Sequence, residues 1–254
     1  MDYISYACSS GLSASTIITQ LSAVSFLHKL AGKRDPTKSF IVKKMLTGVQ
    51  HLKPAGDSRL PFKEKDIAAL VESLRHGPYS VYHKALLKAM YLLAFSAFLR
   101  VGEFTLSRQK TNHVIKYQNV KFVCRNGNVA IHLSMDSYKH SLTPVTLCIV
   151  AQKSDLCPVQ AMRAYLKLRG TCLGPLFIFQ DNTPVSTSYF TSQLKLSVSW
   201  AGLDHNRYKG HSFRIGAATV AAERGATDNE IERMGRWKSK ASKRYIRIPT
   251  LKVQ

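Results

Sequence analysis

Two short motifs near the end of the chain combine residues that can handle a phosphate ester. The segment His211-Ser212-Phe213-Arg214 places an imidazole three residues before a guanidinium, and residues three apart share one face of a helix. Downstream, Gly235-Arg236-Trp237 is followed by Lys243-Arg244-Tyr245. Because a guanidinium is planar, always charged and able to bind two oxygens at once, these motifs predict an oxyanion held close to a phenol.

A further cation, Arg100, follows the most apolar predicted helix of the chain, residues 79–99. A guanidinium next to a hydrophobic core needs an anionic partner. A bound phosphate is one such partner, and the nearby carboxylate of Glu103 is another. The sequence leaves both interpretations open.

Taken in order, Arg100, HSFR, the GRW turn and Tyr245 form a pattern that resembles the tyrosine recombinase (phage-integrase-like) family. The forms HSFR and GRWKS…YIR are most similar to the branch carried by DIRS- and Ngaro-like retroelements and cryptons. The resemblance extends from about Leu60 to the end of the chain, and residues 1–55 resemble more loosely a part of the family's core-binding, DNA-clamping domain. It implies a mostly helical α+β fold, with a small helical N-terminal domain and a catalytic domain, 60–254, that contains a small antiparallel sheet.

The same resemblance implies a catalytic role for six residues, namely Arg100, Lys139, His211, Arg214, Trp237 and Tyr245. The two arginines would clamp the phosphate on which negative charge builds up. A phenol with an ordinary pKa near ~10 is a poor nucleophile at neutral pH, so Tyr245 needs a positive field or a proton acceptor such as His211. Trp237 would donate its indole N–H to the phosphate. It stands eight residues before Tyr245, one fewer than in the common bacterial pattern, which affects where the tyrosine is placed.

The lysine of the family lies on a hairpin, and Lys139 in SYKHS is the best match here, with Lys121 as an alternative. It would protonate the departing 5′ oxygen. The resemblance implies a 3′-phosphotyrosyl intermediate, and therefore site-specific recombination or integration that uses no metal, no ATP and no other cofactor. Two alternatives stay open, a domesticated DNA-binding module without catalysis and a type IB topoisomerase-like activity that relaxes DNA.

Charge points to the same class of partner. The chain has 37 Lys and Arg against 15 Asp and Glu, a formal net charge of +22 at pH 7, which favours double-stranded DNA. No segment is suited to a bilayer or resembles a signal peptide, so we expect an intracellular protein, and the resemblance to a eukaryotic branch implies the nucleus. Family members act as tetramers on DNA, and we expect a homotetramer there and a monomer without DNA. A helical stripe of four residues, Lys240, Lys243, Arg244 and Arg247, is expected to face the DNA.

Several elements must position these residues. Apolar periodicity predicts helices over 13–29, 36–52, 62–74 and 79–99, and the Pro- and Gly-containing stretch 53–60 predicts a domain boundary. Asn126-Gly127 predicts a hairpin between 120–124 and 129–133, and a second hairpin joins 130–135 to 144–150. Helices are expected again from Pro158, over 186–201, from His211, and after the Thr227 capping box. The five cysteines form no CxxC pair and are interpreted as core thiols.

Overall fold

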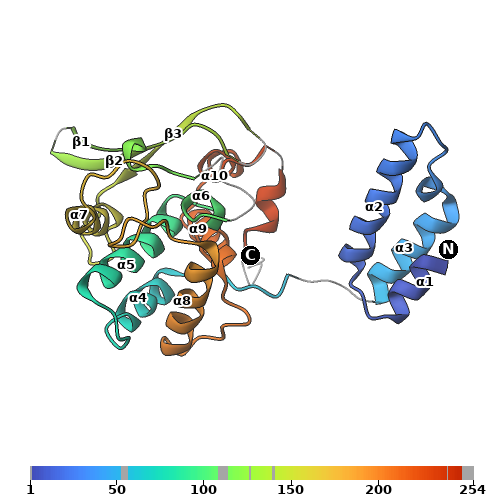
Figure 1. Ribbon diagram of the computed structural model, residues 1–254, viewed down its shortest axis with the longest axis horizontal. Coiled ribbons are helices and arrows are strands. Elements are labelled where there is room, and N and C mark those ends of the chain that lie inside the picture. Colours follow the sequence, from blue (N-terminus) through green and yellow to red (C-terminus); the bar gives the residue numbers. More distant parts are fainter. Residues whose placement is uncertain are drawn as a thin grey trace, which may run out of the picture. The chain divides into compact units, whose positions relative to one another are not determined.

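The structure is a computed structural model that describes residues 2–52, 57–107, 114–125, 127–138, 141–238 and 240–247. The chain forms two compact units, Met1–Ser58 and Arg59–Gln254, and each has a hydrophobic core of its own. Both units are drawn in Figure 1. The division falls inside the stretch 53–60, where the composition of the sequence changes.

The first unit consists of three helices, α1 (Asp2–Ser9), α2 (Ala14–Leu30) and α3 (Phe40–Leu52). The hydroxyl of Ser13 caps α2 by accepting a hydrogen bond from the Thr16 amide, which satisfies a donor that the helix itself leaves unpaired. Pro36 lies in a separate 3-10 turn before α3. The buried core is small and consists of Ile4, Ala7, Ala14, Ile17, Leu21, Val42 and Val49. The predicted helix over 13–29 is confirmed, and the one predicted over 36–52 forms from Phe40 onward, after the 3-10 turn. Helix α1 was not foreseen.

Helices dominate the second unit, which contains α4 (Glu64–Ser73), α5 (Val81–Ser96), α6 (Val101–Phe104), α7 (Pro158–Arg169), α8 (Thr187–Trp200), α9 (Gly210–Glu223) and α10 (Asp228–Gly235). Helix α5 has buried apolar residues of its own on nearly every side. It packs against α4, α7 and α9 in the centre of the unit (Figure 1). Helix α5 ends at Ser96, and Arg100 follows four residues later as the N-cap residue of α6.

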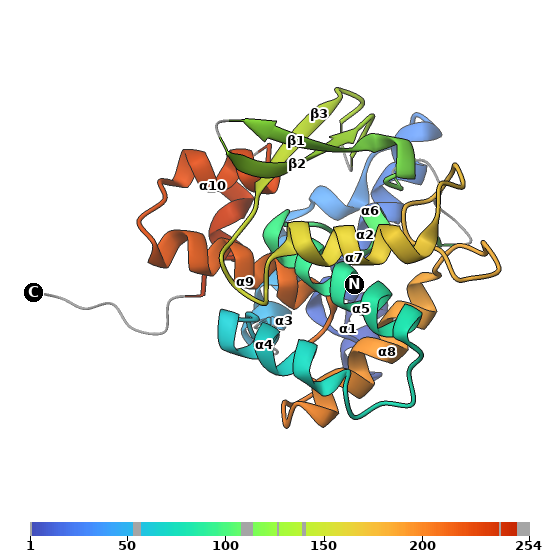
Figure 2. The same cartoon turned by 90° about the vertical axis from the view of Figure 1, so that its left-hand side faces the viewer.

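A three-stranded antiparallel sheet lies over α7 (Figure 2). Its strands are β1 (Val120–Arg125), β2 (Asn128–Met135) and β3 (Val145–Val150), in the order β1-β2-β3. Alternate residues of β2 are buried, namely Ile131, Leu133 and Met135, as expected for a sheet with one face on the core. Both predicted hairpins are confirmed, and Gly127 in the first turn has a φ of 75°. Asn126, Lys139 and His140 lie outside the described residues.

Two helix boundaries follow the sequence signals closely. The hydroxyl of Thr227 accepts from the Glu230 amide, and the Glu230 carboxylate accepts from the Thr227 amide, so the predicted capping box starts α10. Gly170, with a φ of 77°, ends α7, because glycine adopts the left-handed region without steric cost. No helix of the described residues is both long and apolar enough to cross a membrane.

The prediction that the cysteines are core thiols is wrong for three of them. Cys157 is buried, but Cys124, Cys148 and Cys172 are exposed and Cys8 is partly buried. Cys124 and Cys148 lie on outer strands of a sheet that covers the core with one face only. A short apolar strand therefore did not reveal which of its residues would be exposed.

Gly216 shows how closely α9 approaches the segment before α4. A Cβ atom at Gly216 would overlap the backbone of Phe62, and the Phe62 amide donates to the Ser212 carbonyl at 3.1 Å. We expect Gly216→Ala to lower the unfolding free energy by about 1–3 kcal/mol, because overpacking against backbone forces the chain to shift. Gly102→Ala is the control, since nothing lies within 4 Å of its Cβ position. Chemical denaturation measures both, and equal stability of the two variants would contradict the prediction.

Candidate active site

The site is built at the point where α5 ends. Phe98, just beyond the helix, is one of the non-glycine residues with a positive φ, 51°. Such a conformation is unfavourable for a bulky residue and persists only where surrounding contacts hold it. Those contacts are visible here, because the Phe98 carbonyl accepts hydrogen bonds from the guanidinium groups of Arg214 and Arg236.

Glu103 links two of the arginines. Its side chain is 3% exposed and pairs with Arg100 Nη1 at 2.9 Å and with Arg236 Nη2 at 2.9 Å. The Arg100 amide also donates to the Glu103 carboxylate at 2.9 Å. The structure therefore confirms the second interpretation of Arg100, in which Glu103 is its protein partner. Since the Arg100 side chain is still 20% exposed, it can also reach a bound anion.

Arg214 is the most deeply placed of the predicted residues. It is fully buried on α9, where it donates to the carbonyls of Phe98 and Gly235. Its guanidinium carbon lies 4.1 Å from the ring centroid of Trp237 and 5.6 Å from that of Tyr245. Desolvation by burial lowers the pKa of Arg214 below its ordinary value, and the nearby charge of Arg100 lowers it further. A buried cation of this kind favours the arrival of an anion.

Three aromatic rings gather at Arg214. The rings of His211 and Tyr245 have centroids 5.0 Å apart, and those of Trp237 and Tyr245 are 4.8 Å apart. The close approach of Trp237 depends on Gly235, because a Cβ atom there would overlap the indole ring. Five of the six predicted catalytic residues therefore converge, namely Arg100, His211, Arg214, Trp237 and Tyr245. The sixth, Lys139, lies outside the described residues. The alternative lysine, Lys121, is exposed on β1.

The segment that carries Tyr245 differs from the expectation. The expected helical stripe over 240–247 implies a regular helix, but a 3-10 helix covers Lys240–Arg244. Tyr245 follows it in a turn, where its amide donates to the Ser242 carbonyl at 2.8 Å. The Thr219 hydroxyl then fixes the chain by donating to the Tyr245 carbonyl at 3.2 Å and accepting from the Arg247 amide at 3.0 Å. Tyr245 is thus anchored to α9, the helix that also carries Arg214.

The four predicted DNA-binding residues do not form one helical stripe, because the regular helix that would align them is absent from residues 240–247. Lys243 and Arg244 are exposed, and Lys243 lies 3.5 Å from Asp228 in a solvent-exposed ion pair, a kind of pair that contributes little. Arg247 is partly buried. The side chain of Lys240 is outside the described part of the chain.

Sequence reasoning missed Arg236. This residue follows α10 in the left-handed conformation, with a φ of 55°, and its side chain is only 1% exposed. The available signal was a third guanidinium inside the GRW turn, next to a tryptophan already chosen. Only the contacts with Glu103 and Phe98 reveal its place.

Charge and hydrogen bonding in the site are both incomplete. In the part of the chain that the structure describes, Glu103 is the carboxylate that pairs with Arg100 and Arg236, and its charge also acts on Arg214. Among the described residues, buried N–H groups of Arg214, Arg236 and Trp237 have no acceptor. Buried donors are normally satisfied, so the excess of positive charge, together with the unpaired donors of Arg214 and Trp237, suits an oxyanion next to the Tyr245 phenol.

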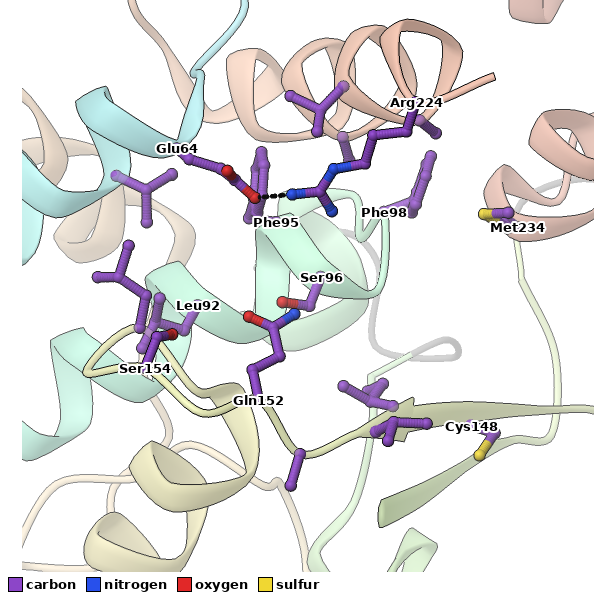
Figure 3. A pocket seen from close by; sticks show the side chains of 18 of the residues that line it. Glu64, Leu92, Phe95, Ser96, Phe98, Cys148, Gln152, Ser154, Arg224 and Met234 are labelled. Atoms are coloured by element: carbon purple, nitrogen blue, oxygen red, sulfur yellow. Dashed lines mark hydrogen bonds and ion pairs between the residues drawn. The ribbon is translucent and has the colours of Figure 1, made fainter. Parts of the chain in front are cut away.

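A separate cavity of about 870 Å³ has Phe98 in its lining (Figure 3). Phe95, Phe98 and Met234 contribute to its apolar wall, and the ion pair between Glu64 and Arg224 spans one end of it. Phe98 also packs edge-on against Trp237, with ring centroids 6.4 Å apart. The cavity and the site therefore share a wall, but the cavity contains none of the predicted catalytic residues.

Comparisons with known proteins show what the chain as a whole is similar to. No family model matches the sequence. The chain is 26% identical over 245 residues to an integrase/recombinase XerD homolog from Selenomonas ruminantium. The aligned region covers 92% of this chain and 68% of that protein. The chain thus spans about two thirds of this relative.

Solved structures share the fold. The XerH site-specific recombinase in a post-cleavage complex with its palindromic difH substrate matches with a TM-score of 0.65 and 15% identity, over 96% of this chain and 66% of that one. A lambda integrase (75-356) dimer bound to a COC' core site matches with a TM-score of 0.67 and 12% identity, over 100% and 82%. The chain is thus similar in sequence to an integrase/recombinase, and it shares its fold with solved structures of a site-specific recombinase and an integrase.

Proposed function

We propose that the protein breaks and rejoins double-stranded DNA by site-specific recombination or integration, with Tyr245 as the nucleophile. The observation that carries the proposal is a cluster of three buried or half-buried guanidinium groups, in which Arg100 and Arg236 pair with Glu103 and Arg214 lies against the ring of Tyr245, which in turn contacts His211. A phosphodiester supplies the missing negative charge and the missing acceptors. The similarity to an integrase/recombinase over most of the chain supports the same proposal.

In the proposed reaction the phenol oxygen of Tyr245 forms a bond to the scissile phosphorus while the bond to the 5′ oxygen breaks. The phenolic proton passes to His211, and Lys139 returns a proton to the 5′ oxygen, with Lys121 as the alternative donor. Arg100 and Arg214 stabilise the charge on the non-bridging oxygens, and the indole N–H of Trp237 donates to one of them. The 3′-phosphotyrosyl bond keeps the energy of the broken bond, so attack by a 5′ hydroxyl can reseal the strand.

The finer features of the proposal rest on the sequence. Motif forms such as HSFR place the chain closest to the DIRS- and Ngaro-like retroelement and crypton branch, which implies a nuclear protein. Residues 1–55 are proposed as part of a DNA-clamping domain, and Lys240, Lys243, Arg244 and Arg247 as DNA contacts. The protein is proposed to form a homotetramer on DNA and to be a monomer without DNA.

A nicked duplex tests the chemistry. The short fragment released after cleavage diffuses away, so an active enzyme stays covalently attached to the DNA and shifts in a denaturing gel. Plasmids with one or two target sites then separate the activities, because recombination exchanges segments between sites whereas a topoisomerase only relaxes supercoils. Binding without any adduct would identify a DNA-binding module without catalysis.

Salt dependence tests the partner itself. The formal charge of +22 predicts that several phosphates are neutralised, and log K should fall with log salt by roughly 0.9 for each phosphate contacted. Fluorescence anisotropy on a labelled duplex measures the slope between low and moderate salt. A slope near zero would argue against duplex DNA as the partner.

A further inference from the structure

We propose that Arg236 is a positioning residue that sets the orientation of both Arg100 and Arg214. The inference rests on the proposed function, because it assigns Arg236 to the organisation of a phosphate-binding site. Arg236 itself would not touch the DNA. Its side chain is 1% exposed, against 20% for Arg100, so the protein covers it on all sides.

The first connection runs through Glu103. Arg236 Nη2 lies 2.9 Å from one carboxylate oxygen, and Arg100 Nη1 lies 2.9 Å from the other. Arg236 shares its oxygen of the carboxylate with the Arg100 amide, which donates to it at 2.9 Å. A charge-assisted bond is stronger than one from a neutral amide, so Arg236 strengthens the hold on the carboxylate that orients Arg100.

The second connection runs through the strained residue Phe98. Arg236 donates to the Phe98 carbonyl at 3.2 Å and to the neighbouring Ala97 carbonyl at 3.2 Å. The same Phe98 carbonyl accepts from Arg214. Because Phe98 has a φ of 51°, it needs such contacts to stay in place. Arg236 thereby holds the acceptor against which Arg214 is aligned.

Both connections require the fork of a guanidinium. Nη1 and Nη2 of Arg236 bond simultaneously to carbonyls and to a carboxylate, which a lysine ammonium on a flexible stem cannot reproduce in the same geometry. Arg236→Lys therefore keeps the charge and removes the alignment. Arg233→Lys is the matched control, because Arg233 is exposed on α10 only three residues away.

The first experiment measures single-turnover adduct formation on the nicked duplex with excess protein. We expect Arg236→Lys to lower the maximal rate of adduct formation by about 10- to 10²-fold, because a small misplacement of reacting groups has an effect of this size. The DNA concentration that gives half of the maximal rate should stay unchanged. In an Arg214→Lys background the same substitution should cost clearly less than it does in the wild type, because part of its effect acts through Arg214. Fully multiplicative losses, or weaker DNA binding with a smaller salt slope, would overturn the inference.

A second readout is independent of catalysis. Inorganic sulfate serves as the probe, and the rise of the Tm with sulfate concentration reports the anion site. Wild type and Arg233→Lys should show the full rise, Arg214→Lys none, and Arg236→Lys at most half. If Arg236→Lys does not fold, Glu103→Gln, which removes the same anchor, takes its place with the same expectations in both assays.

The two proposals fail in different ways. A wild-type response to sulfate that Arg236→Lys weakens, without any covalent adduct, would reject the proposed function and keep the positioning role. An Arg236→Lys protein with the full sulfate response would reject the positioning role whatever the adduct assay gives. A wild type that does not respond to sulfate would also overturn it, because there would be no anion site to organise.

Discussion

Tyr245→Phe is expected to abolish covalent adducts on the nicked duplex, with a loss of about 10⁴-fold or more, while DNA affinity stays within about twofold. The variant removes one oxygen, the atom that forms the bond to phosphorus, and loss of a nucleophile has effects of this size. It keeps the ring that packs on His211 and Trp237, so the surrounding site should persist. A denaturing gel of the adduct and an anisotropy titration measure the two quantities.

Tyr208→Phe is the control for this experiment. Tyr208 is also partly buried in the second unit, where its ring stacks on Phe62 at a centroid distance of 5.0 Å. Its hydroxyl has no role in the proposed reaction, so adduct formation should be normal. Residual adduct in Tyr245→Phe would mean that another side chain is the nucleophile, and the assignment of Tyr245 would be lost.

Arg214→Gln is expected to reduce adduct formation by about 10²- to 10³-fold, which corresponds to about 3–4 kcal/mol of transition-state stabilisation. Its effect on folding should be modest. Arg214 is buried beside Arg100 and Arg236 with one carboxylate among them, so its removal relieves repulsion while it sacrifices hydrogen bonds to Phe98 and Gly235. The function of the site thus requires an arrangement that the fold alone would not favour.

A second buried arginine provides the comparison. Arg169 is 6% exposed and donates to four carbonyls, those of Gly170, Cys172, Pro175 and Leu176. No other guanidinium shares these acceptors among the described residues. Arg169→Gln should therefore lower the Tm more than Arg214→Gln does, and it should leave adduct formation by the folded protein unchanged. Thermal unfolding measures the two Tm values, and the adduct assay measures activity. A lower Tm for Arg214→Gln than for Arg169→Gln would contradict the argument that removing Arg214 relieves repulsion between buried arginines.

The sequence alone determined the elements and the chemical types. Apolar periodicity, the Asn126-Gly127 turn and the Thr227 capping box are local signals, and they predicted the helices, the hairpins and the mostly helical α+β fold. The order of Arg100, HSFR, GRW and Tyr245 indicated a resemblance to the tyrosine recombinase family and selected residues that converge in the structure.

Long-range contacts decided the rest. Whether the GRW arginine would be exposed or buried depended on Glu103 and on the Phe98 carbonyl, which lie more than 130 residues earlier in the chain. The segment before Tyr245 has helix-forming residues, but the contacts of Thr219 with residues 245 and 247 accompany a short 3-10 turn in place of a regular helix. Local propensity is worth tenths of a kcal/mol per residue, whereas a buried guanidinium must find its partners wherever the fold supplies them, and only the tertiary structure shows where that is.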